Sequence, residues 1–128
     1  MRARALRAAL AAAALAAAPA AFACGICVED KVAATYDYDV VTRATARHHV
    51  VVFAAVDDPR ATAAPRALRE AAARVRGVDR ASVRSAAAPR ALSFALDPRA
   101  GTPRAALRSI ERQPAMAGVR LTLIRVMR

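Results

Sequence analysis

The first periodic pattern of apolar residues in the chain, after its N-terminal stretch, is helical. Apolar residues recur at every fourth position from Val28 to Ala44, which places them along one face of a helix. Glu29 and Asp30 lie in the first turn and two arginines lie in the last turn, as the helix macrodipole favours. We therefore expect one helix of about five turns over residues 28–47.

A strand pattern follows this helix. Residues 50–56 form an unbroken apolar run that is rich in β-branched side chains, and Asp57-Asp58-Pro59 ends it. Because the run is too short for a stable helix and has no polar face, it predicts a strand that is buried on both faces.

The rest of the chain predicts two helices and three strands. The first helix starts at Asp58-Pro59 and ends before Gly77. The second has Thr102 as its N-cap and Pro103 at its first position. The strands cover residues 82–86, 92–96 and 119–126.

The order of these elements from residue 49 onward is βαββαβ, the split βαβ arrangement of ferredoxin-like domains. In that topology the first and third strands are central, and here they are the two most continuously apolar strands. We expect an α+β fold in which a ferredoxin-like sandwich over residues 49–128 follows an extra N-terminal helical segment over residues 24–48 and a signal peptide over residues 1–23.

Residues 1–23 have the layout of a secretory signal peptide. Three arginines precede an apolar run over Ala8–Ala18, and Ala21-Phe22-Ala23 supplies a small-x-small cleavage site. The run is shorter than the roughly 20 apolar residues that a spanning helix needs. Cleavage would leave Cys24 as the first residue, so a lipoprotein with a lipidated Cys24 stays open as an alternative. We expect a periplasmic or otherwise exported protein.

Length and charge limit the classes of function. The 128 residues allow one small domain. The net charge is +11 because 20 arginines and one lysine stand against ten aspartates and glutamates. Such an arginine- and alanine-rich composition often reflects a GC-rich genome, and the aromatic side chains that stack on bases are not interleaved with the arginines. We expect no nucleic-acid partner. Attraction to anionic lipid or envelope polymers fits the charge, as does membrane association if Cys24 is lipidated. The identity of any protein partner cannot be read from the sequence.

Three segments, Val78–Val83, Leu92–Pro98 and Pro103–Arg112, resemble the second half of a heavy-metal-associated domain. The resemblance extends over about residues 49–127 and implies a small ferredoxin-like module that passes soft metal ions, typically copper. The family's Met-x-Cys-x-x-Cys loop lies between the first strand and the first helix. That loop is Asp57-Asp58-Pro59-Arg60 here and contains no Cys, so the resemblance supplies no metal ligand at that place.

The only cysteines of the chain, Cys24 and Cys27, form a CxxC motif at the start of the first predicted helix. Two thiolates at this spacing can hold Cu(I) or another soft ion, or half of a zinc site. They can also act as a redox disulfide, or close a structural disulfide, which is the default in an oxidising compartment. Because Glu29 and Asp30 favour a cation and raise the pKa of nearby thiols, we favour soft-metal binding through Cys24 and Cys27. A thiol–disulfide redox protein and a structural or lipid-anchored interaction module remain the alternatives.

The other candidate residues indicate a function less clearly than the CxxC motif does. His48 and His49 would lie about 30 Å from the CxxC motif if residues 28–47 formed a straight helix, so we expect them to interact with the helix C-terminus and not to bind metal. Tyr36 is predicted in the core, and Asp37 and Tyr38 in solvent. The chain contains no GxGxxG, P-loop or HExxH motif, and no convincing Ser-His-Asp set. We expect a protein without enzymatic activity.

Overall fold

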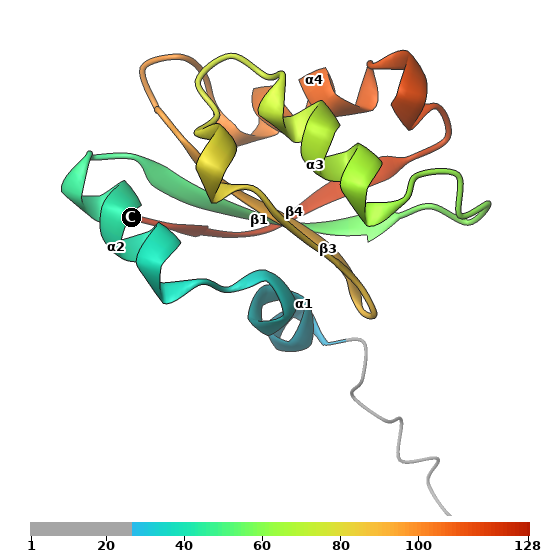
Figure 1. Cartoon of the computed structure of the whole chain (residues 1–128), viewed down its shortest axis with the longest axis horizontal. Helices are drawn as coiled ribbons and strands as arrows, with labels where there is room; N and C mark the ends of the chain where they lie inside the picture. Colours follow the sequence, from blue (N-terminus) through green and yellow to red (C-terminus); the bar gives the residue numbers. More distant parts are fainter. Residues whose placement is uncertain (1–26) are drawn as a thin grey trace, which may run out of the picture.

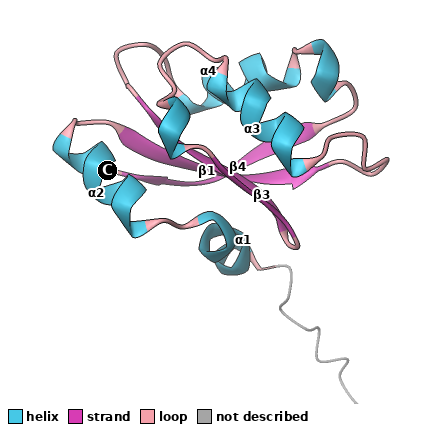
Figure 2. Ribbon diagram, in the orientation of Figure 1, coloured by secondary structure: helices cyan, strands magenta, loops and turns pink. Residues whose placement is uncertain are grey.

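A four-stranded antiparallel sheet with helices on both faces forms the described part of the chain, residues 27–128 of a computed structural model (Figure 1). Figure 2 shows the same arrangement by type of secondary structure. The elements are α1 (Val28–Thr35), α2 (Tyr38–Ala46), β1 (Val50–Asp57), α3 (Pro65–Ala73), η1 (Arg80–Ser82), β2 (Arg84–Ala87), β3 (Arg90–Leu96), α4 (Pro103–Glu111), η2 (Pro114–Met116) and β4 (Arg120–Met127). The predicted signal peptide and Cys24 lie outside the described residues.

The strand order β2-β3-β1-β4 confirms that the first and third strands are central and that the second and fourth are edges. β1 pairs antiparallel with β3, where Val50 faces Leu96, and with β4, where Asp57 faces Arg120. From β1 onward the helices and strands follow the predicted βαββαβ order, and the α+β architecture is compatible with a ferredoxin-like fold.

Both faces of the central strand are buried, as its apolar run predicts. Val52 and Ala54 contribute to a large core beneath α3 and α4, whereas Val51 and Phe53 contribute to a smaller core beneath α1 and α2. The alternation follows from the two-residue repeat of a strand. Because α1 and α2 cover the second face, the sheet is the middle layer of three (Figure 1).

The prediction of one continuous helix over residues 28–47 is wrong, because the chain leaves the helical conformation at Tyr36 and Asp37. Asp37 is extended, with φ −136° and ψ 115°, and its Oδ1 accepts hydrogen bonds from the backbone N–H groups of Asp39 (2.9 Å) and Val40 (3.2 Å). Aspartate at an N-cap satisfies amides at a helix start. Arg84 also binds the Asp37 carboxylate, with its Nη2 2.9 Å from Oδ2. Asp37 therefore starts a second helix.

The break also changes which side chains are buried. Val32, Val40 and Ala44 are buried as predicted. The prediction that Tyr36 lies in the core is wrong. Tyr36 lies at the break between α1 and α2, and its side chain is 46% exposed. Tyr38 is 70% exposed, as predicted.

The helix predicted to start at Asp58-Pro59 starts later, at Pro65. Between these positions the chain forms a loop in which Ala61 has a positive φ of 49°. The Asp58 carboxylate accepts hydrogen bonds from the backbone N–H groups of Thr62 and Ala63 within this loop. Asp58 thus stabilises the turn after β1, and Pro65 takes the first helical position, where its missing N–H is tolerated.

Gly77 ends the turn after α3 at a position that only glycine fits. Its φ is +88°, and a Cβ built there would lie 2.4 Å from the Ala100 Cβ. Gly118 also has a positive φ, +82°, but a Cβ there would meet nothing within 4 Å. We expect Gly118→Ala to lower the free energy of unfolding by about 1 kcal/mol through backbone strain, and Gly77→Ala by about 3 kcal/mol because overpacking adds to it. Urea unfolding of both variants measures the difference, and equal losses would refute the contact at Gly77.

Candidate functional site

The structure places one of the two predicted metal ligands, Cys27, at the N-cap of α1. Its backbone is extended, with φ −62° and ψ 152°, and its carbonyl oxygen accepts a hydrogen bond from the Lys31 backbone N–H at 3.3 Å. The side chain is partly buried. A thiol at a helix N-terminus faces the positive end of the helix dipole, which favours the thiolate. The predicted placement of Cys27 at a helix start is confirmed.

Side-chain and packing contacts hold α1 on the sheet. Val32 and Thr35 are buried against it, and the Ser93 hydroxyl of β3 donates a hydrogen bond to the Thr35 carbonyl oxygen at 3.0 Å. At the other end of the helix, Arg125 of β4 forms an ion pair with Glu29. The helix is therefore tied to the sheet near both ends, and Cys27 lies at the start of this anchored helix.

The charge beside Cys27 differs from the predicted acidic first turn. Arg125 binds Glu29 with both guanidinium Nη atoms, with Nη1 3.0 Å from Oε2 and Nη2 on Oε1. The hydrogen bonds from Arg125 lower the pKa of Glu29. Arg125 therefore offsets one of the two negative charges that the sequence places in this turn, and Asp30 is the other. The electrostatic argument for a cation is weaker than the sequence alone indicates.

His48 and His49 lie at the far end of α2 from α1 (Figure 1). His48 has a left-handed φ of 57° and follows the C-cap Arg47, so it sits at a helix C-terminus as predicted. His49 borders a hollow of about 600 Å³ against the loop before α4, and its buried Nδ1 has no hydrogen-bond partner among residues 27–128. No group of three or more His, Cys, Asp or Glu side chains within residues 27–128 is placed to hold a metal ion.

The loop between β1 and α3, residues 58–64, contains no cysteine. It is built around Asp58, whose side chain is 1% exposed. Besides the two backbone N–H groups, its carboxylate accepts hydrogen bonds from the Thr62 hydroxyl and from Arg90 Nη1, both at 2.9 Å. These bonds, of which the one from the Ala63 N–H has the largest effect, lower the pKa of Asp58 to about 2. Its role is to shape the loop.

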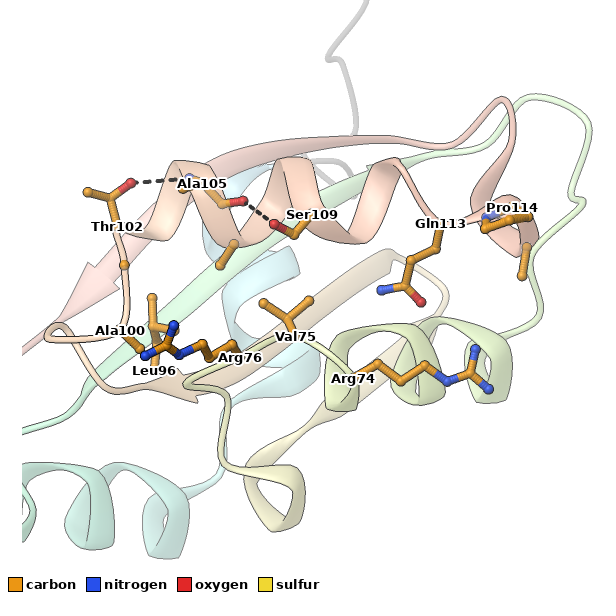
Figure 3. Close-up of a pocket in the computed structure, with 13 residues that line it drawn as sticks. Arg74, Val75, Arg76, Leu96, Ala100, Thr102, Ala105, Ser109, Gln113 and Pro114 are labelled. Carbon is orange, nitrogen blue, oxygen red and sulfur yellow. Dashed lines mark hydrogen bonds between the residues drawn. The ribbon is translucent and has the colours of Figure 1, made fainter.

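Sequence reasoning missed a groove between the end of α3 and α4 (Figure 3). Its volume is about 720 Å³, within the range of small-ligand sites. The floor includes Leu96 and Ala106, and Arg74 and Arg76 lie along one wall. At one end Gln113 Nε2 donates a hydrogen bond to the Ala71 carbonyl oxygen at 2.7 Å, while its buried Oε1 has no partner in the described chain. No local motif marks this groove, since its lining comes from four separate segments.

Comparisons with known proteins do not place the chain in a family. No family model, no curated protein and no solved structure matches it. Within residues 27–128, no helix is both long enough and apolar enough to cross a membrane. The structure shows an α+β fold, with a cysteine at the start of α1 and a groove between α3 and α4.

Proposed function

We propose that this chain is an exported protein without enzymatic activity that binds one soft metal ion, expected to be Cu(I), through the thiolates of Cys24 and Cys27. The observation that carries the proposal is the position of Cys27 at the start of a helix anchored on the sheet. The helix N-terminus favours the thiolate that a metal requires. Thiolate ligands select soft ions such as Cu(I).

Two sequence features support the same proposal. The layout of residues 1–23 as a secretory signal indicates export to the periplasm or beyond, with lipidation of Cys24 as the alternative fate of the new N-terminus. The resemblance of residues 49–127 to heavy-metal-associated domains implies transport of soft metal ions. Because the corresponding loop holds no cysteine, the CxxC motif before α1 is the place where such an ion would bind.

A thiol–disulfide redox role is the second candidate, and the Glu29–Arg125 ion pair favours it. A carboxylate near a thiol raises the thiol pKa and so lowers its reactivity. Arg125 offsets the charge of Glu29, the carboxylate two residues after Cys27 in the sequence. The redox model predicts a CxxC disulfide with a potential well above that of structural bridges, and turnover with a dithiol reductant.

Anaerobic titration of the reduced protein with Cu(I) against a competing chelator tests the metal proposal. We expect about one ion per chain, and loss of that binding in both Cys24→Ser and Cys27→Ser, since each removes half of a two-thiolate site. The matched control is His48→Ala/His49→Ala, which removes the histidines of the chain and should bind as the wild type does. Equal uptake by the wild type and the double Cys→Ser variant would end the proposal.

Mass spectrometry of the N-terminus of the exported protein separates the remaining alternatives. Free thiols are required for metal binding, and a CxxC disulfide reduced by a dithiol in repeated cycles would support the redox role. A lipid thioether on Cys24 would exclude both thiol functions, because one sulfur of the pair would no longer be available. A chain that still carries residues 1–23 after export would refute the predicted signal peptide.

A further inference from the structure

The two helical layers that cover the sheet carry opposite balances of charge. The layer formed by α3, its following turn and α4 holds two glutamates, Glu70 and Glu111, and seven arginines: Arg66, Arg69, Arg74, Arg76, Arg104, Arg108 and Arg112. All seven arginines are exposed. The layer formed by α1 and α2 holds four carboxylates against two arginines and one lysine. An arginine-rich composition alone would enrich both layers, so the basic face belongs to α3 and α4. These two helices lie on the same side of the sheet (Figure 1).

Most of the arginines on this face have no role in holding the fold. Arg66 pairs with Glu70, and Arg69 donates a hydrogen bond to Ser85. Within residues 27–128, the guanidinium groups of the other five make no hydrogen bond or ion pair. These five are Arg74, Arg76, Arg104, Arg108 and Arg112. Elsewhere in the described chain, Arg47, Arg84, Arg90 and Arg125 are each paired with a carboxylate. The other six arginines there have no side-chain partner within residues 27–128, so what distinguishes the α3/α4 face is the number of its arginines.

The basic face carries charge and contains a groove, but it has no large exposed apolar side chain. The exposed large apolar side chains of the described residues, Val28, Tyr36 and Tyr38, all lie in the α1 and α2 region. Protein interfaces usually centre on buried aromatic or apolar residues. The groove between α3 and α4 opens within the basic face, and Arg74 and Arg76 are among the residues that line it (Figure 3).

We propose that the α3/α4 face docks on a membrane surface rich in anionic phospholipid, with a phosphate-bearing headgroup in the groove between the two helices. A lipid surface presents repeated negative charges in a plane and needs no apolar anchor on the protein. A phospholipid headgroup offers a phosphate that the exposed arginines of this face can bind. This inference is independent of the cysteines, and so it can hold whether or not the chain binds metal.

Flotation of the full chain with vesicles of phosphatidylglycerol and phosphatidylcholine in equal parts tests the proposal. The test variant is Arg74→Gln/Arg76→Gln/Arg108→Gln, and the matched control is Arg43→Gln/Arg80→Gln/Arg120→Gln. All six arginines are exposed and have unpartnered guanidinium groups in the described chain, and both triple variants remove three charges. We expect the test variant to lose about fivefold in vesicle partitioning for each arginine removed, and the control to lose much less.

Further measurements test whether the α3/α4 face binds anionic lipid specifically. Binding should be absent on pure phosphatidylcholine vesicles and should disappear at an ionic strength of about 1 M, where the Debye length is about 3 Å. Equal losses in the two triple variants would overturn the proposal, since net charge alone would then explain the attraction. Stronger binding to RNA or to an acidic peptide than to the vesicles would overturn it as well.

Discussion

Replacing Phe94 by alanine is expected to lower the free energy of unfolding by about 3–5 kcal/mol. Phe94 lies on the central strand β3, is 0% exposed and faces Val52 across the sheet pairing. It belongs to the large core beneath α3 and α4. Because the surrounding core is close-packed, its side chains can fill the cavity left by the phenyl ring only in part. Small domains have total stabilities of only about 5–15 kcal/mol, so this variant should be close to unfolding.

Urea unfolding measured by circular dichroism gives the comparison, with Tyr38→Ala as the control. Tyr38 is 70% exposed, so its truncation should change the free energy of unfolding by less than about 0.5 kcal/mol. Phe53→Ala removes a ring from the smaller core beneath α1 and α2 and should loosen those helices first. If Phe94→Ala were as stable as Tyr38→Ala, the assignment of Phe94 to the main core would be wrong.

Acidification is expected to weaken the fold through Asp58. The hydrogen bonds to its carboxylate lower its pKa from the ordinary 3.8 to about 2. Because the folded-state pKa is below the unfolded-state value, the carboxylate contributes its full stabilisation above pH 3.8 and loses it as the pH falls toward 2. In the wild type, the stability should therefore fall across this interval.

Asp58→Asn should lower the midpoint of thermal unfolding at neutral pH by several degrees and flatten the pH dependence in this interval. The amide cannot accept all four hydrogen bonds, and it leaves Arg90 without its carboxylate partner. The control is Asp57→Asn, at the exposed neighbouring position whose side chain makes no hydrogen bond within residues 27–128. Thermal unfolding from acidic to neutral pH measures both variants. Equal effects of the two substitutions would contradict a structural role of Asp58 in the loop.

The position of the candidate site could be predicted only in part. A CxxC motif before a helix pattern correctly placed Cys27 at a helix start, because capping depends on neighbouring residues. The charge around it could not be predicted, since Arg125 approaches Glu29 from a strand 96 residues later in the chain. The groove between α3 and α4 was also beyond prediction, because its lining residues are brought together only when the two helices pack side by side on the sheet.

By itself, the sequence determined the elements whose signals are local. The apolar runs of β1 and β3, and Thr102 with Pro103 at the start of α4, were recognised because strand burial and helix capping are set by adjacent residues. Only the tertiary structure decided the break at Asp37, since that carboxylate, besides capping the backbone N–H groups of Asp39 and Val40, binds Arg84 from 47 residues away. The tertiary structure also decided that the arginines of α3 and α4 share one face of the sandwich. The apolar side of each helix packs on the sheet, and the charged side is left in solvent.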